Sequence, residues 1–492
     1  MKLKRQAGVL MHISSLPGPE GIGTLGRPAH DFVDFLERVG ARVWQMLPVG
    51  PAGGGDSPYQ SPSTFAGNPL LIDFALLREE GLLDERAEAW PDGPVDYPRV
   101  LRNRRMMLER AFALSYARLE SEVADFRRRN AWAEDYALFM ALREHFEGAR
   151  LDAWPDRAAR LREPEAIEQY RALLSDRIDR HLFAQYLFER QWAALKAYAA
   201  GKGVRLFGDL PIYTAADSAD VWTHPELFKL DEERRPVKVA GVPPDYFSED
   251  GQLWGNPVYA WKAHKASDYA WWVERMRGVA NRFDWVRIDH FIGFVNYYSV
   301  DYGAPNAREG AWKKGPGAGL FRAICRALPE LTIVAEDLGV TNPKVDALRK
   351  QYGFPGMKVL QFGFDPGKRN PHRPERIKKN CVAYTGTHDN DTTLGWWESA
   401  SPGLRRAVRK RLPLGPGEDV VERMVHAVMM SRAATCVIPM QDILGLGNEA
   451  RMNLPGTPEG NWRWRMSPDA LSDELTQRLK RLIDESGRGA DA

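Results

Sequence analysis

The stretch Trp285-Val286-Arg287-Ile288-Asp289-His290 is a short apolar run that ends in charged and polar residues. Seven more runs of this kind occur along the chain, and helical patterning lies between most of them, which is typical of repeated βα units. Eight parallel strands with crossover helices close a (β/α)8 TIM barrel, an α/β fold whose active site lies at the C-terminal ends of the strands. The other seven runs are Gly8 to His12, Val43 to Pro48, Val204 to Asp209, Thr332 to Asp337, Met357 to Phe362, Val382 to Asp389 and Ala434 to Asp442.

The chain is much longer than a plain barrel, so large insertions must lie between its strands. It has 492 residues, whereas a barrel of this type takes about 250. Helical patterning with charged faces fills residues 49–200 and predicts a mostly helical subdomain. Residues 212–265 are rich in Pro, Gly, Asp and aromatic residues and predict substrate-covering loops, and residues 445–466 predict a further loop over the active site. We therefore expect a single catalytic barrel over residues 1–492.

Little sequence remains after the last predicted strand and its loop. A surface helix is expected from Pro468 to Ile483, followed by a frayed tail from Ser486 to Ala492. No separate C-terminal β-domain is expected.

Composition and charge exclude several classes of partner. The chain has 68 basic and 66 acidic residues and a net charge of +2, so no global field favours nucleic acid or an anionic membrane. Its three cysteines are far apart and form neither a disulfide framework nor a zinc motif. No signal peptide or membrane span is visible. We expect a cytoplasmic protein that binds neither nucleic acid nor membrane and has no obligate protein partner.

Carboxylates lie at or next to the ends of five of the eight runs. Because the C-terminal ends of barrel strands meet at one face, these side chains are predicted to gather at the barrel mouth. They are Asp209, Asp289, Glu336, Asp389 and Asp442.

Two of these carboxylates have surroundings that suit opposite roles. Residues two apart in a strand share a face, so Arg287 and Asp289 point together, and the guanidinium favours an ionised carboxylate that can act as a nucleophile. Glu336 follows the apolar Ile333-Val334-Ala335, where burial should raise its pKa and keep it protonated. The alternatives are a structural ion pair for Asp289 and a loop cap for Glu336.

A neutral carboxylic acid opposite an ionised carboxylate is the pair that glycosidic chemistry requires. The acid protonates the leaving oxygen while its partner attacks the sugar carbon. Asp289 and Glu336 lie on neighbouring predicted strands, which is compatible with the carboxyl separation of about 5 to 5.5 Å in retaining enzymes. His388 and Asp389 close the seventh run and are placed to bind sugar hydroxyls in the transition state.

Other motifs suggest different chemistry but lack required residues. Gly21-Ile22-Gly23-Thr24-Leu25-Gly26 matches a dinucleotide fingerprint, yet Ser14 to Glu20 separate it from the preceding strand. Asp389-Asn390-Asp391 opens like a calcium loop, but the later glycine and glutamate are missing. His290 and His388 with nearby Asp residues leave metal-assisted hydrolysis open as an alternative, although His12 stands alone on the first strand. We expect no metal and no cofactor.

The chain resembles the amylomaltases, which are 4-α-glucanotransferases of glycoside hydrolase family 77 in the α-amylase clan. The matching segments run through most of the chain and are specific as a set. They are Asp56-Ser57-Pro58-Tyr59-Gln60-Ser61, Gly208-Asp209-Leu210-Pro211-Ile212-Tyr213, Arg287-Ile288-Asp289-His290, Glu336-Asp337-Leu338-Gly339, Thr387-His388-Asp389-Asn390 and Asn461-Trp462-Arg463-Trp464.

The resemblance implies a role for each matching residue. Asp289 would be the nucleophile, Glu336 the acid/base and Asp389 the transition-state stabiliser. The implied substrates are α-1,4-glucans and malto-oligosaccharides, which places the activity in glycogen and maltodextrin metabolism, with no metal required. The expected substrate-binding residues are Tyr59, Asp209, Trp254, Asn256, Arg287, His290, His388 and Asn461.

Transfer requires that a sugar hydroxyl reach the intermediate before water does. Two loops are suited to shielding it: Asp245 to Gly255, with Tyr246, Phe247 and Trp254, and Asn453 to Trp464. The expected reaction moves glucan segments to a new 4-hydroxyl group and can close rings. A retaining α-glucan hydrolase and a non-catalytic glucan-binding barrel remain the alternatives.

Overall fold

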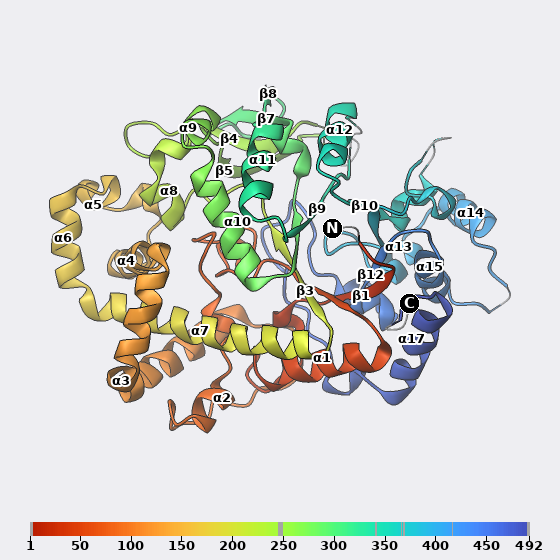
Figure 1. Ribbon diagram of the computed structural model, residues 1–492, viewed down its shortest axis with the longest axis horizontal. Helices are drawn as coiled ribbons and strands as arrows, with labels where there is room; N and C mark the ends of the chain where they lie inside the picture. The colour runs from red at the N-terminus through yellow and green to blue at the C-terminus, as the bar shows by residue number, and fades with distance from the viewer. Residues whose placement is uncertain are drawn as a thin grey trace.

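Eight parallel strands close into a barrel in the computed structural model (Figure 1). Each of the eight predicted runs overlaps one of these strands, so the predicted TIM barrel is confirmed. Neighbouring strands are hydrogen-bonded in the order β1-β12-β11-β10-β9-β6-β3-β2. The strands are β1 (Gln6–Leu10), β2 (Val43–Gln45), β3 (Arg205–Leu210), β6 (Trp285–Ile288), β9 (Thr332–Ala335), β10 (Gly356–Val359), β11 (Cys381–Tyr384) and β12 (Thr435–Pro439).

The structure describes residues 3–244, 249–339, 342–365, 367, 370–415 and 417–489. Within these ranges, the barrel strands are buried at almost every position. Both faces of a parallel barrel are covered, which is why its strands are continuous apolar runs and not alternating ones. No helix in the described ranges is long and apolar enough to cross a membrane.

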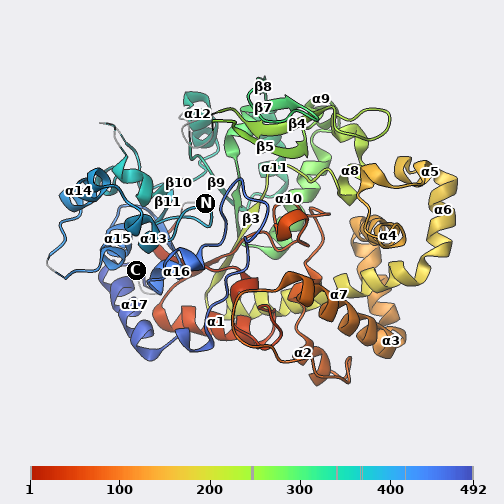
Figure 2. The same cartoon turned by 180° about the vertical axis from the view of Figure 1, so that it is seen from behind.

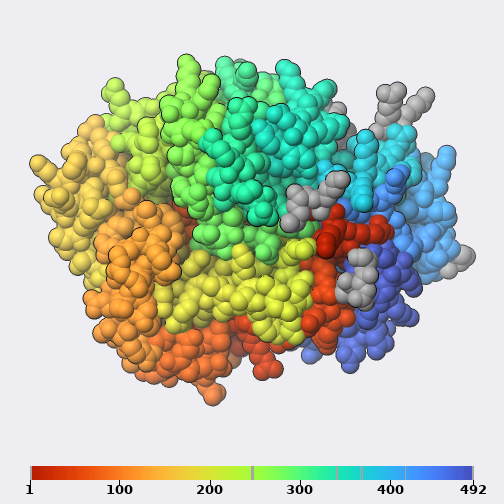
Figure 3. All heavy atoms as spheres, in the orientation of Figure 1, coloured from red at the N-terminus to blue at the C-terminus, as the bar shows by residue number. Residues whose placement is uncertain are grey.

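The segment between β2 and β3 is helical. Its long helices pack against one another, with α7 lying against both α3 and α4. In Figure 3 this insertion, coloured orange to yellow, forms one end of the molecule, and the blue C-terminal part of the chain lies at the other. Its helices are α2 (Phe74–Glu79), α3 (Tyr97–Arg129), α4 (Ala131–His145), α5 (Arg157–Leu161), α6 (Pro164–Leu173) and α7 (Ser175–Gly201).

A second, four-stranded antiparallel sheet lies at one edge of the barrel (Figure 2). Its order is β5-β4-β7-β8, with β4 (Lys238–Val242), β5 (Gln252–Pro257), β7 (Asn296–Asp301) and β8 (Gly310–Lys314). Sequence patterning predicted only loops over β4 and β5. These strands were missed because β4 pairs with β7 as well as with β5. β7 comes from beyond the fourth barrel strand, and strand formation depends on such distant pairing.

The glycines of Gly21-Ile22-Gly23-Thr24-Leu25-Gly26 are explained by close packing. A Cβ on Gly23 would lie 1.9 Å from the Ile13 carbonyl oxygen, and one on Gly26 would lie 2.1 Å from an Asp73 carboxylate oxygen. Neither position has room for a larger side chain. The glycine pattern is therefore a packing requirement at the start of α1 (Arg27–Val39).

The expected frayed tail is wrong for its first four residues. The surface helix is present as α17 (Asp473–Glu485), which packs against α1, and the chain then turns inward at Ser486. Arg488 is fully buried, and its five N–H groups donate to five backbone carbonyls. The acceptors are the oxygens of Gln6, Met429, Ser431, Ala433 and Ala434, at 2.7 to 3.3 Å.

Replacing Arg488 with methionine is expected to lower the free energy of unfolding by on the order of 3 kcal/mol, because buried carbonyls lose their donors. Chemical denaturation monitored by tryptophan fluorescence measures the change. Arg481→Met on the exposed side of α17 is the matched control, with an expected effect within about 0.5 kcal/mol. Equal stability of the two variants would show that the Arg488 contacts contribute nothing net.

Candidate active site

Asp289 and Glu336 lie side by side at the C-terminal face of the barrel. β6 pairs in parallel with β9, with Ile288 opposite Ala335, so each acidic residue directly follows its strand. The Glu336 N–H donates to the Ile288 carbonyl at 3.0 Å. Barrel closure therefore brings together two carboxylates that are 47 positions apart in the chain.

Arg287 joins two carboxylates through one buried guanidinium. Its Nη1 contacts both Asp209 oxygens at 2.8 and 2.6 Å, and its Nη2 donates to Asp289 Oδ1 at 2.6 Å. The Asp209 side chain is fully buried, whereas that of Asp289 is 30% exposed. Burial opposes the charge of Arg287, but the two carboxylates outweigh it and raise the pKa of Arg287 well above its usual range. Asp289 is thus the member of this group that remains open to a ligand.

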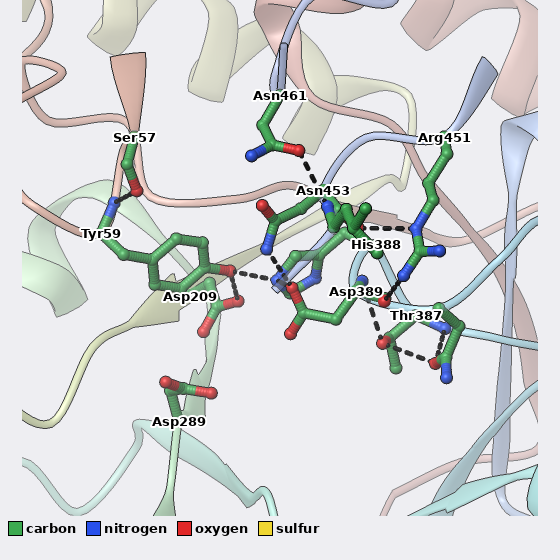
Figure 4. Close-up of polar contacts among 12 residues, drawn as sticks. Ser57, Tyr59, Asp209, Asp289, Thr387, His388, Asp389, Arg451, Asn453 and Asn461 are labelled. Carbon is green, nitrogen blue, oxygen red and sulfur yellow. Dashed lines mark hydrogen bonds and ion pairs between the residues drawn. The ribbon is translucent and has the colours of Figure 1, made fainter. Parts of the chain in front are cut away.

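Tyr59 and His388 extend this network toward Asp389 (Figure 4). Tyr59 Oη donates to Asp209 Oδ2 at 2.8 Å and lies 2.9 Å from His388 Nε2. The Tyr59 hydroxyl has a single proton, and it donates that proton in the hydrogen bond to the Asp209 carboxylate, which can only accept. In the second hydrogen bond, His388 Nε2 must therefore be the donor and the Tyr59 oxygen the acceptor. His388 Nε2 is also 3.4 Å from Asp389 Oδ1. A continuous polar chain therefore runs through Asp389, His388, Tyr59, Asp209, Arg287 and Asp289.

Glu336 is the buried carboxyl of the site. Burial, followed by the charge of Asp289, raises the pKa of Glu336 to about 7, although Arg287 and a backbone hydrogen bond oppose this shift. Its Oε2 accepts from the His290 N–H at 2.9 Å, and its Oε1 accepts from the Leu338 N–H at 2.7 Å. At neutral pH this carboxyl is therefore available both as an acid and as a base.

His290 stands between the carboxylates and an aromatic ring of the second sheet. Its ring meets that of Trp254 edge-on, with centroids 4.8 Å apart. Burial lowers the pKa of His290 to about 4 despite the opposing charge of Asp289, so the imidazole is neutral. Its Nε2 is buried and has no hydrogen-bond partner among the described residues. The free nitrogen is suited to a sugar hydroxyl, and Trp254 offers an aromatic face beside it.

Asn256 and Asn461 lie near the site but use their amides within the protein. Asn256 donates to the Thr214 carbonyl at 3.0 Å and accepts from Gln60 Nε2 at 3.2 Å. Asn461 accepts from the Leu454 N–H at 2.8 Å and donates to the Thr457 carbonyl at 3.0 Å. Both side chains are less than 9% exposed, and they hold the surrounding loops together.

The fifth strand-end carboxylate, Asp442, is not part of the charged network. It is 4% exposed and accepts hydrogen bonds from the Thr385 hydroxyl and from the N–H and hydroxyl of Thr393, at 2.5 to 2.7 Å. These contacts fix the segment that follows β11. Asp442 therefore lies just beyond β12, as predicted, but its hydrogen bonds give it a structural role.

Sequence analysis missed two residues that hold Asp389. Asn453 Nδ2 donates to Asp389 Oδ1 at 2.7 Å, and Arg451 Nη2 donates to the Asp389 carbonyl at 2.6 Å. Both lie in the loop after β12, in Arg451-Met452-Asn453, where no spacing rule marks them. The Asn453 N–H also donates to the His388 carbonyl at 3.1 Å, so this loop is attached to the site at two points.

The first of the two aromatic loops, Asp245 to Gly255, is only partly described. Tyr246 and Phe247 lie outside the described residues. The Trp462 ring lies 5.7 Å from that of Tyr59 and 6.0 Å from that of His388, and the residue is 5% exposed. Trp462 is therefore buried against Tyr59 and His388, whereas Trp254 is the ring that faces His290.

Comparisons with known proteins identify a family. A family model described as 4-alpha-glucanotransferase matches residues 11–472. The 4-alpha-glucanotransferase of Thermus thermophilus is 47% identical, with 99% of this chain and 100% of that protein aligned. That of Streptococcus pneumoniae is 45% identical, with 97% and 96% aligned.

Solved structures agree with the sequence comparisons. The amylomaltase from Streptococcus agalactiae in complex with acarbose has a TM-score of 0.96 at 42% identity, with 99% of this chain and 100% of that chain covered. The amylomaltase from Corynebacterium glutamicum has a TM-score of 0.78 at 18% identity, with 97% of this chain and 75% of that chain covered. The second match shows the fold alone.

Proposed function

The chain belongs to the 4-alpha-glucanotransferase family, EC 2.4.1.25, and on that premise we propose that it moves α-1,4-glucan segments through a covalent intermediate on Asp289. The observation that supports this mechanism is the adjacent pair at the ends of β6 and β9. Asp289 is ion-paired to Arg287, and the pKa of Glu336 is about 7. This division into anion and neutral acid is the one that retaining transfer requires.

In the first half-reaction the donor glucan loses its leaving chain. Asp289 attacks the anomeric carbon while Glu336 gives its proton to the glycosidic oxygen, so that bond breaks as the glycosyl–Asp289 ester forms. Arg287 remains paired with Asp209 when the charge of Asp289 is consumed, so no buried cation is left alone. The leaving chain then departs with a new 4-hydroxyl group, which carries the proton from Glu336.

In the second half-reaction an acceptor replaces the leaving chain. Glu336, now ionised, takes the proton of the acceptor 4-hydroxyl as the acceptor oxygen attacks the anomeric carbon. The bond between that carbon and Asp289 breaks, which restores the Asp289 carboxylate. Asp389 binds hydroxyls of the flattened sugar ring and is held by Asn453 and Arg451. An acceptor on the same chain yields a large ring.

The remaining expected binding residues act in two ways in this proposal. Tyr59, Asp209, Arg287 and His388 form one hydrogen-bonded group that orients Asp289 beside the sugar. His290 and Trp254 contact the glucan directly. Asn256 and Asn461 contribute through the loops that their amides hold.

Incubation with maltotriose tests the activity. Transfer produces glucose together with longer oligosaccharides while the number of reducing ends stays constant. Rising reducing ends would instead show an α-glucan hydrolase, and an unchanged substrate would show a non-catalytic glucan-binding barrel. With long amylose, products that lack a reducing end measure cyclisation.

The pH dependence follows from Glu336. Because the donor half-reaction needs the protonated acid, kcat/KM for maltotriose is expected to fall above pH about 7, tenfold per unit once well past the pKa. A maltosyl fluoride donor, whose leaving group needs no proton, should not show this decline. A decline of equal size with both donors would assign it to another group.

A further inference from the structure

Main-chain groups alone orient the Glu336 carboxyl. The His290 N–H donates to Oε2 and the Leu338 N–H to Oε1, and no side chain in the described part of the chain donates to either oxygen. The neighbouring Phe291 N–H donates to the Glu336 carbonyl at 3.2 Å. Two successive N–H groups of residues 290 and 291 thus converge on a single residue.

An unusual backbone conformation makes this convergence possible. His290 has φ 49° and ψ 50°, in the left-handed region, immediately before the 3-10 turn Phe291–Phe294. A left-handed residue beside a right-handed turn points successive N–H groups to the same side. Here the His290 N–H reaches the Glu336 carboxyl, and the Phe291 N–H reaches the main-chain carbonyl of the same residue. The left-handed region is costly for a residue with a Cβ. In return, this conformation allows the two hydrogen bonds to Glu336.

We propose that His290 is a positioning residue that acts through its main chain: its left-handed backbone aims the N–H that holds Glu336 Oε2 for proton transfer. This inference rests on the proposed role of Glu336 as acid/base. It is separate from the contact that the imidazole makes with Trp254 or with a sugar hydroxyl. An N–H donor favours the ionised carboxyl, so it also offsets part of the effect of burial on the Glu336 pKa.

Four substitutions separate the main chain from the side chain. His290→Gly, His290→Asn, His290→Ala and His290→Val all remove the imidazole, but they differ in their tolerance of positive φ. Glycine adopts it freely and asparagine tolerates it, whereas alanine resists it and β-branched valine resists it most. Differences in kcat among these four variants therefore reflect the backbone conformation of residue 290 and not the loss of the imidazole.

The expected result is that kcat for maltotriose transfer is similar in the glycine and asparagine variants and about tenfold lower in the valine variant, the change that a left-handed penalty of about 1.4 kcal/mol produces. The basic limb of the pH profile should also move upward in the valine variant, because losing the N–H donor raises the pKa of Glu336. Thermal unfolding shows which variants are folded. If the valine variant does not fold, the alanine and glycine variants are compared in its place, and the expected difference in kcat is smaller.

Equal kcat and an unmoved basic limb across folded variants would overturn the inference, since His290 would then act only through its ring. Glu336→Gln, assayed in parallel, distinguishes this outcome from a failure of the proposed function. Loss of transfer in Glu336→Gln with no difference within the His290 series rejects the positioning role alone. Retained transfer in Glu336→Gln rejects the acid/base assignment itself, and with it the positioning role.

Discussion

Replacing Asp289 with asparagine is expected to lower kcat for maltotriose disproportionation by at least about 10⁴-fold, the scale on which loss of a catalytic nucleophile acts. An amide of the same shape does not attack the anomeric carbon, so no glycosyl ester forms. The fold should survive, because Arg287 keeps both contacts to Asp209. Glucose release at saturating maltotriose measures the loss, and thermal unfolding verifies the structure.

Asp442→Asn is the matched control for Asp289→Asn. Both residues are strand-end carboxylates, but Asp442 is buried among donors from Thr385 and Thr393. Its replacement should lower the melting temperature while the folded enzyme retains most of its kcat. Transfer that persists in Asp289→Asn would remove that residue from the mechanism and restore the alternative of a different nucleophile.

Arg287→Met is expected to lower the free energy of unfolding by about 3 to 5 kcal/mol, because it leaves a buried carboxylate without its partner. Asp209 is the group left unpaired, and its side chain is fully buried. Transfer activity should also fall by at least about 10²-fold, because Asp289 loses the cation that orients it. Denaturant unfolding and maltotriose assays measure the two effects separately.

The stability loss in Arg287→Met should depend on pH in a definite direction. An unpaired buried Asp209 has a folded-state pKa above its unfolded value, so the folded state binds the additional proton. Stability is then greatest at acidic pH and decreases as pH rises through the folded-state pKa. The free energy of unfolding of the variant should therefore be lower at pH 8 than at pH 5.

A double variant tests whether charge is the cause. Arg287→Met with Asp209→Asn removes both members of the pair, so most of the lost stability should return while transfer remains low. If the double variant is as unstable as Arg287→Met alone, lost packing around the guanidinium is responsible and not the unpaired carboxylate.

Much of the catalytic framework is predictable from sequence because it depends on local pattern. Each barrel strand is buried on both faces, and an apolar run that ends in a polar residue marks both the strand and its C-terminal end. The position of Asp289 two residues after Arg287 in one strand predicts that the two share a face, and their ion pair at 2.6 Å agrees with that geometry.

Other features depend on groups that are distant in the chain. The strand β4 pairs with β5 on one side and with the distant β7 on the other, and this sheet carries Trp254, which faces His290. Asn453 meets Asp389 across 64 positions of sequence, and Arg488 ends among the carbonyls of β1 and the segment before β12. No periodicity within a window of residues reports such contacts.

The sequence by itself determined the barrel, the strand ends that carry Asp289, Glu336 and Asp389, and the family, because burial pattern and motif spacing are written along the chain. Only the tertiary structure decided the surroundings of each carboxyl. Burial sets the pKa of Glu336 near 7, Arg287 binds Asp209 together with Asp289, and Asp442 is enclosed by hydroxyl and amide donors. Desolvation and hydrogen bonding depend on distances between atoms, and those distances exist only once the barrel has closed.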